Sequence, residues 1–264
     1  MADADALGEV AGPNRLPPTT SGAPGSTGSA PEADTTMSLV DHLGELRSRI
    51  IRSILAVAVG AVIGFILSSN VRRLLIELLP SAKVQALSPG DPFAISLRIA
   101  IVIGVILAMP VLLYQLWAFV APGLTPHERR LIRPWIPLAL FFFALGVVIA
   151  WIILPFALTF LLSFTDQYIT GDTLAAVPYF DFVTTMFLAF GLLMEFPIVL
   201  YALSRVGIVT SKRLAASRRI AILAIAIFAA VATPGGDLVS PTVLGGTMYL
   251  LFELTLIAIR RSGK

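Results

Sequence analysis

A single carboxylate, Glu128, stands in a loop that is otherwise basic. Its neighbours in sequence include the arginines Arg129, Arg130 and Arg133. The loop follows Pro122-Gly123, a pair that ends helices because proline lacks a backbone N–H and glycine suits the turn after a helix C-terminus. A carboxylate forms strong hydrogen bonds with guanidinium and ammonium groups. We therefore expect Glu128 to bind a cationic ligand just beyond the end of a helix.

The helix before this loop must lie in a membrane. It ends in three aromatic residues, Tyr114, Trp117 and Phe119, and aromatic side chains gather at membrane interfaces. The chain as a whole is 57% hydrophobic and 13% charged, with a mean hydropathy of +0.89, whereas soluble domains average about 25% charged residues. The chain is therefore predicted to be an integral membrane protein, with Glu128 just outside the bilayer.

Several chemical classes are excluded by what the sequence lacks. Without cysteine it has no disulfide, thiolate metal site or cysteine nucleophile, and two histidines, His42 and His127, cannot form a His-rich metal site alone. It also has no His-Glu-x-x-His, Gly-x-Ser-x-Gly, phosphate-binding loop or dinucleotide fingerprint. We predict a protein that is not an enzyme and that has no cofactor, metal or nucleic-acid partner.

Residues 1–36 differ in composition from the rest. They are rich in Ala, Pro, Gly, Ser and Thr, and their acids outnumber one base, Arg15. Such a segment buries too little apolar surface to offset the entropy of ordering it. We expect a disordered tail over 1–36 and a membrane domain over 37–264.

The membrane domain is predicted to be an all-α bundle of six transmembrane helices. A span needs about 20 mostly apolar residues. The third candidate contains Pro137 and Pro155 and should be kinked or tilted. The fifth has only 13 apolar residues between Arg219 and Thr233, which favours local thinning of the bilayer. We expect the fifth and sixth spans to be short. The six candidates lie at about 50–69, 94–120, 134–162, 178–203, 218–233 and 239–259.

Lysine and arginine placement predicts the orientation. Fourteen basic residues, from Arg47 to Lys264, fall on the side of the two termini, and four fall on the other side. Those four are Arg72, Arg73, Lys83 and Arg98, which we place in the first outer loop. Basic residues stay in the cytoplasm, so both termini are predicted to be cytoplasmic.

The segment before the first span has a helical pattern of its own. Leucines recur at helical spacing over residues 38–49, and Asp41, Glu45 and Arg49 share another face. One interpretation is an amphipathic anchor on the membrane surface with charge pairs four residues apart. The other makes Glu45 a second acid near Glu128, so that two carboxylates face two arginines, each hydrogen bond contributing about 1.5–3 kcal/mol.

Glu195 is the only charge between Asp181 and Arg205. An ionised acid at this depth costs about 2.5–3.5 kcal/mol on insertion scales. We therefore expect Glu195 to face protein or water, or to stay protonated. It is either a structural hydrogen-bonding group or part of a polar pathway, a partner contact or a proton-coupled step.

Two weaker features involve glycines and turns. Thr233-Pro-Gly-Gly-Asp237 is typical of a tight turn on the outer side. Gly60 and Gly64 form a Gly-x-x-x-Gly pattern in the first span, which favours close packing against another helix.

Together these segments resemble the TatC family, the polytopic subunit of the twin-arginine, Sec-independent protein translocase. The resemblance covers residues 38–259. It depends on the order and spacing of five segments: His42-Leu-Gly-Glu-Leu-Arg47, Pro110 through Arg130, Glu195-Phe-Pro197, Thr233-Pro234 with Asp237, and Met248 through Glu253.

The resemblance implies a concave, glove-like bundle in the cytoplasmic membrane of a prokaryote. It implies that Glu128 and Glu45 bind the twin-arginine signal peptide of folded cargo, with Phe119, His42 and Arg47 at the same site. Glu195 would face the hollow, and Thr233 with Asp237 would lie where single-span TatA and TatB partners dock. The protonmotive force would drive transport, and self-association is expected.

A different class of function remains open from the residues alone. A proton-coupled transporter of small molecules or ions would use Glu195 as its proton carrier. The sequence shows no internal repeat, which weakens this alternative because many transporters are built from repeated halves.

Overall fold

The computed structural model describes residues 39–79, 83–126, 129–130, 134–164, 173–205, 211–233 and 237–261. The chain divides into Met1–Ser38 and Leu39–Lys264, and all that follows concerns the second unit. The predicted tail over 1–36 lies outside the described residues.

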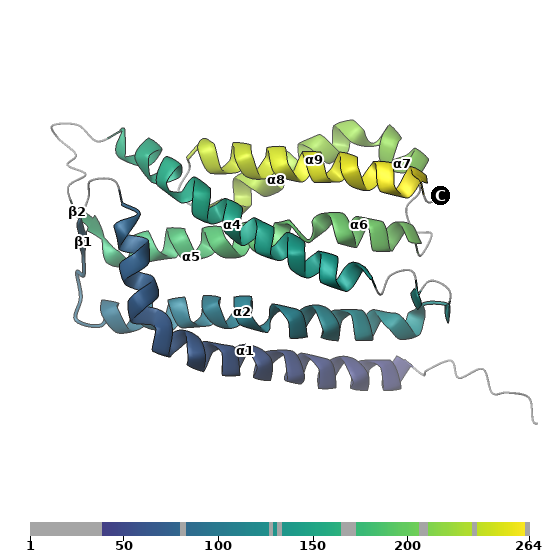
Figure 1. The fold of residues 1–264 in the computed structure, drawn as a ribbon, viewed down its shortest axis with the longest axis horizontal. Helices are drawn as coiled ribbons and strands as arrows, with labels where there is room; N and C mark the ends of the chain where they lie inside the picture. Colours follow the sequence, from purple (N-terminus) through teal and green to yellow (C-terminus); the bar gives the residue numbers. More distant parts are fainter. Residues whose placement is uncertain are drawn as a thin grey trace, which may run out of the picture. The chain divides into compact units, whose positions relative to one another are not determined.

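Helices make up most of this unit (Figure 1). Two three-residue strands, β1 (Lys83–Gln85) and β2 (Thr173–Ala175), pair in parallel. The helical elements are α1 (Leu39–Glu77), α2 (Asp91–Val120), the 3-10 turn η1 (Ala121–Gly123), α4 (Trp135–Leu162), α5 (Ala176–Leu193), α6 (Phe196–Arg205), α7 (Ser211–Ala216), α8 (Arg218–Ala232) and α9 (Val239–Arg261).

Among the described residues, five segments are long and apolar enough to cross a membrane. The fifth predicted span, at 218–233, is the helix α8. Its 15 residues extend only about 22 Å at 1.5 Å per residue, so its crossing of the membrane stays a prediction. The sixth predicted span is α9, which has 23 residues and is the shortest of the five. The five segments are His42–Glu77, Asp91–Gly123, Trp135–Leu162, Ala176–Ser204 and Val239–Arg261.

The helix α1 corrects two expectations about the start of the domain. A surface helix over 38–49 and a span over 50–69 were expected, but one helix of 39 residues contains both. It also includes Arg72 and Arg73, which were placed in a loop; Arg98 likewise lies inside α2. Figure 1 shows that α1 turns in its last part. There Ser68 donates a hydrogen bond to the carbonyl of Phe65 (2.7 Å), a side-chain contact that bends helices.

The predicted span at 178–203 is interrupted. α5 ends at Leu193 and α6 begins at Phe196, so Met194 and Glu195 form a turn. Pro197 accounts for the break, since proline has no N–H and its ring clashes with the carbonyl four residues earlier. Glu195 therefore lies at a break between two helices rather than in the middle of one.

The packing of α1 on α2 depends on glycine. A Cβ on Gly60 would lie 2.7 Å from the carbonyl oxygen of Gly104, and a Cβ on Gly64 would lie 2.6 Å from that of Ala100. These distances leave no room for a side chain, so the two backbones touch. The close packing predicted from Gly60 and Gly64 is confirmed, and it fixes how the start of α1 meets the end of α2.

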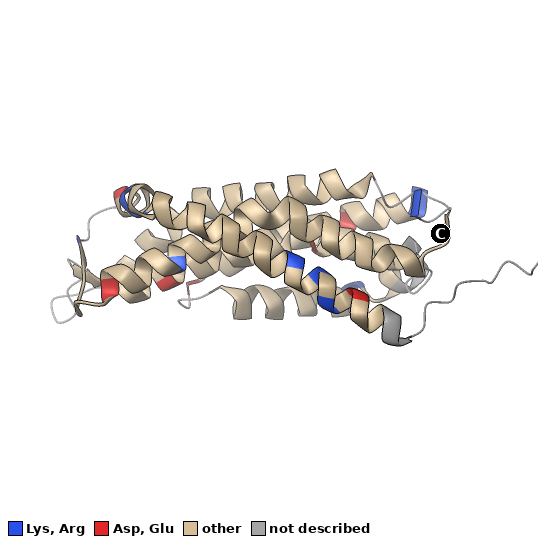
Figure 2. Ribbon diagram, turned by 90° about the horizontal axis from the view of Figure 1, so that it is seen from below, with Lys and Arg blue, Asp and Glu red and all other residues tan. Residues whose placement is uncertain are grey.

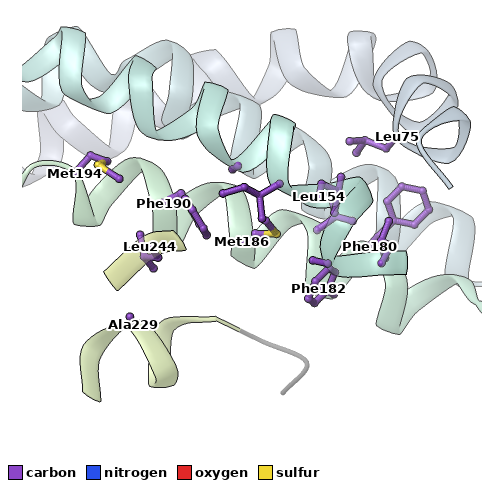
Figure 3. Close-up of a cluster of buried hydrophobic side chains, with 14 of the residues drawn as sticks. Leu75, Leu154, Phe180, Phe182, Met186, Phe190, Met194, Ala229 and Leu244 are labelled. Carbon is purple, nitrogen blue, oxygen red and sulfur yellow. The ribbon is translucent and has the colours of Figure 1, made fainter. Parts of the chain in front are cut away.

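The hydrophobic core lies along α5. Phe180, Phe190, Met186 and Met194 are fully buried there, and side chains of α1, α4, α8 and α9 pack around them (Figure 3). α4, in which Pro155 lies, crosses its neighbours obliquely in Figure 1, as the predicted tilt requires. This core holds the helix ends in fixed positions, and the candidate site is built from two of those ends.

Charged residues lie mostly toward the ends of the helices (Figure 2). We call the end where α1 begins and α2 and α9 finish the basic end, because Arg47, Arg49, Arg129, Arg218 and Arg261 lie there. The other end, with β1 and β2, is the strand end. Between the two ends, most residues are uncharged (tan in Figure 2). A helix that spans a bilayer requires such an apolar middle.

Candidate functional site

At the basic end, the start of α1 lies against the end of α2. The ring of His42 stacks on that of Phe119, with centroids 4.5 Å apart and planes 17° from parallel. These residues are 77 positions apart in sequence, and the antiparallel contact of the two helices brings them together. Two of the predicted site residues therefore form one surface.

Glu45 lies one turn along α1 and already holds a guanidinium group. The Nε atom of Arg49 donates to Oε1 of Glu45 at 3.0 Å, and the Nη2 atom of Arg49 donates to the same oxygen. Nη1 of Arg49 also donates to the side-chain oxygen of Gln115 on α2 (3.3 Å). Arg49 therefore connects the two helices through a carboxylate on one and an amide on the other.

Two polar atoms of α1 and α2 have no hydrogen-bond partner among the described residues. Oε2 of Glu45 lies 3.9 Å from Nδ1 of His42 and is buried, and the buried Nε1 of Trp117, whose ring contacts Tyr114, lies elsewhere on α2. Buried polar groups are nearly always hydrogen-bonded, so each exception calls for an explanation. The carboxylate of Glu45 beside the two stacked rings therefore has hydrogen-bonding capacity that the described part of this chain does not use.

Arg129 closes the end of α2. Its Nε and Nη2 atoms donate to the carbonyl oxygen of Ala121 at 3.1 and 2.7 Å. The last carbonyls of a helix lack partners within the helix, and a guanidinium there also complements the negative end of the helix dipole. Arg129 thus stabilises the C-terminal end of α2 by hydrogen-bonding a carbonyl there. Glu128 and His127, next to it in sequence, lie outside the described residues, as does Arg133.

The other predicted site residues are not part of this cluster. Arg47 is exposed on α1. Glu195 is 8% exposed at the break between α5 and α6. Its Oε1 atom is buried without a partner in the part of the chain that the structure describes. Glu195 therefore faces the protein, while its role stays a prediction.

Thr233 and Asp237 are buried at the strand end, between α8 and α9. The hydroxyl of Thr233 donates to the carbonyl of Ala229 (2.8 Å), and Oδ2 of Asp237 accepts the N–H of Ser240 (2.6 Å). A carboxylate that accepts a free N–H in the first turn stabilises a helix start. Asp237 thus stabilises the start of α9 at Val239. Residues 234–236, between Thr233 and Asp237, lie outside the described part of the chain.

The comparison with known protein families decides what this arrangement belongs to. The family described as Sec-independent protein translocase protein (TatC) matches residues 41–246, which include the α1–α2 site and the start of α9. The chain belongs to the TatC family.

Individual TatC proteins agree with this assignment along most of the chain. TatC of Carboxydothermus hydrogenoformans is 33% identical over 226 residues, covering 84% of this chain and 93% of that protein. TatC of Aquifex aeolicus is 36% identical over 227 residues, covering 83% and 93%. A crystal structure of the twin-arginine translocase receptor TatC in DDM has a TM-score of 0.73 and 35% identity, covering 83% of this chain and 99% of that one.

Membership in the TatC family makes this chain a membrane component of the Sec-independent, twin-arginine protein translocase. It is a transport subunit rather than an enzyme, which confirms the prediction drawn from the missing catalytic motifs. The alternative of a small-molecule transporter is not favoured.

Sequence reasoning about this TatC protein missed two sets of contacts. Gln115 was overlooked because its hydrogen bond with Arg49 depends on how α1 and α2 pack. The sequence feature that could have identified it is a single amide side chain within an apolar helix. The sequence also indicated no partner for Glu253, to which Nη2 of Arg218 donates a hydrogen bond at 2.9 Å. The hydroxyl of Tyr249 donates to the other oxygen of Glu253 (3.1 Å).

Proposed function

We propose that this TatC protein is the signal-peptide receptor of its translocase. The twin-arginine signal peptide of a folded cargo binds at the basic end, where Glu45 and Glu128 accept hydrogen bonds from its two arginines. The observation that carries the proposal is Glu45 itself, a partly buried carboxylate that binds a guanidinium group beside the stacked rings of His42 and Phe119. A site that holds Arg49 in this way has the chemistry to hold an arginine of another chain.

The remaining parts of the site have supporting roles. Phe119 and His42 offer a stacked aromatic surface for the guanidinium plane, since arginine stacks well on aromatic faces. Arg129 fixes the end of α2 through the carbonyl of Ala121. Arg47, which is exposed on α1, belongs to the rim of the surface that the signal peptide crosses.

The proposed orientation places the basic end in the cytoplasm, with both termini there. The fourteen basic residues on that side support it, because cytoplasmic segments of membrane proteins carry an excess of Lys and Arg. In this orientation the signal peptide meets Glu45 before the cargo crosses. The bundle then has six spans, with α8 crossing a locally thinned bilayer.

Partner proteins of the TatA and TatB type dock beside α8 and α9 in this proposal. An apolar cavity of about 320 Å³ lies between these helices, with Ile225, Pro241, Gly245 and Tyr249 among its lining residues. Thr233 and Asp237 lie at the strand end of the same helix pair. Organisation of these partners around bound cargo, self-association of the receptor and use of the protonmotive force complete the proposed role.

Binding of a synthetic signal peptide tests the receptor function. The full chain in lipid nanodiscs is titrated with a fluorescent peptide that contains two adjacent arginines. We expect Glu45→Gln and Glu128→Gln each to weaken binding about tenfold or more, since each removes a charged acceptor. Glu77→Gln is the matched control, because Glu77 is an exposed acid at the strand end of the same helix. Equal affinity in all four proteins would contradict the proposal.

A further inference from the structure

The carboxylate proposed to bind the signal peptide is already occupied by an arginine of the same chain. Nε and Nη2 of Arg49 both donate to Oε1 of Glu45. The two side chains are only 19% and 21% exposed, so this contact is largely shielded from water. An external arginine that approaches Glu45 therefore meets a carboxylate with one oxygen in use.

The second carboxylate oxygen of Glu45, Oε2, is not accessible to an external arginine. Oε2 is buried and lacks a hydrogen-bond partner among the described residues. Its surroundings include the ring of His42, whose Nδ1 atom lies 3.9 Å away, and His42 is held by its stack on Phe119. An arginine from outside cannot reach Oε2 while these side chains keep their places, so binding requires that Arg49 give up Oε1.

Gln115 provides the acceptor to which Arg49 can move. Its side-chain oxygen already lies 3.3 Å from Nη1 of Arg49, and Gln115 is buried on α2. An amide oxygen is neutral, so its hydrogen bond to a guanidinium is weaker than that of a carboxylate. Arg49 therefore prefers Glu45 when no ligand is present and shifts toward Gln115 only when another guanidinium takes its place.

We infer that Arg49 acts as an internal competitor of the signal peptide and sets the affinity that any peptide must have to occupy the site. This inference rests on the proposed receptor function. A signal arginine replaces the two-nitrogen contact of Arg49 with an equivalent one. A lysine ammonium is a compact point charge that cannot reproduce that planar contact, so a lysine displaces Arg49 poorly. Arg49 thus weakens every peptide by the same factor, so that only a peptide with the stronger arginine contact occupies the site at low concentration. Gln115 is a positioning residue that acts through Arg49.

The peptide titration described above, extended to a twin-lysine peptide, tests the inference. In Arg49→Gln the competitor is gone, so we expect both peptides to bind about three- to tenfold more tightly. Because both peptides displace the same side chain, the ratio of the two affinities should stay the same. Arg52→Gln is the control, because Arg52 is an exposed arginine of the same helix and should leave both affinities unchanged.

Gln115→Leu gives an independent prediction of opposite sign. Without the second acceptor, Arg49 remains on Glu45, and the twin-arginine peptide should bind about two- to fivefold more weakly. In the double variant Arg49→Gln, Gln115→Leu this loss should disappear, since Gln115 acts only through Arg49. A merely structural role of Gln115 would give the same loss whether or not Arg49 is present.

The outcomes separate this inference from the proposed function. If Arg49→Gln weakens or does not change peptide binding while Glu45→Gln abolishes it, the receptor function stands and the competitor role of Arg49 is overturned. That role is also overturned if the Gln115→Leu loss persists in the double variant. If Glu45→Gln and Glu128→Gln bind the peptide as tightly as the unaltered chain, the receptor site itself is wrong.

Discussion

Replacing Glu45 by lysine is expected to abolish export of folded cargo that carries a twin-arginine signal peptide. The substitution removes the carboxylate that holds Arg49 and places a second cation beside it. Each charge-assisted hydrogen bond lost from the signal peptide corresponds to about 1.5–3 kcal/mol, or about 10- to 100-fold in binding. Repulsion between the new lysine and the signal arginines adds to this loss. Export is measured in cells in which the variant is the only receptor of this kind.

The matched control is Glu77→Lys, which makes the same charge reversal at the strand end of α1. It should export cargo normally and accumulate in the membrane to the same level as Glu45→Lys. Normal export by Glu45→Lys at equal membrane level would show that the carboxylate of α1 does not recognise the signal peptide.

Replacing Glu195 by methionine is expected to stabilise the protein and to impair export. Glu195 is buried, and its Oε1 atom has no hydrogen-bond partner in the described part of the chain. An unsatisfied buried polar group costs about 1–3 kcal/mol, and an apolar side chain of similar volume removes that cost. The thermal unfolding midpoint in detergent should therefore rise by about 2–10 °C. Export should fall, because functional sites often sacrifice stability and the presence of a costly buried carboxyl here indicates a polar step in transport.

Glu195→Gln separates the two effects. It keeps a polar side chain in the break between α5 and α6, so its unfolding midpoint should stay near that of the unaltered chain. A methionine variant that unfolds at a lower temperature would mean that the carboxyl is satisfied in the folded protein. A more stable methionine variant with full export would mean that Glu195 has no part in transport.

The apolar spans were predictable because a bilayer requires about 20 consecutive apolar residues. This requirement holds however the helices pack against one another, so the sequence alone shows it. Helix ends were less predictable. α1 continues to Glu77 through Arg72 and Arg73, since a charged residue marks the edge of the apolar region but does not end a helix. The break before α6 was foreseeable from Pro197 alone, because proline disrupts the helix that precedes it.

The candidate site was predictable to a different degree. The residues alone left two alternatives open for Glu45 and made Phe119 an interfacial aromatic, and the resemblance to the TatC family assigned both to one site. Their placement at one end follows from the antiparallel spans. The contact between Arg49 and Gln115 was not predictable, because it joins residues 66 positions apart. It depends on the register in which Gly60 meets Gly104, and the sequence indicates close packing there without indicating the partner.

Photocrosslinking from position 119 tests the receptor account most directly. A benzophenone amino acid replaces Phe119, which stacks on His42 beside Glu45; in a control protein it replaces the exposed Phe93 at the other end of α2. Native membranes are then supplied with folded cargo whose signal peptide carries two arginines or two lysines. The account predicts a crosslink from position 119 only, and only with the twin-arginine cargo. Equal crosslinks from both positions, or a crosslink from position 119 that persists with twin lysines, would contradict it.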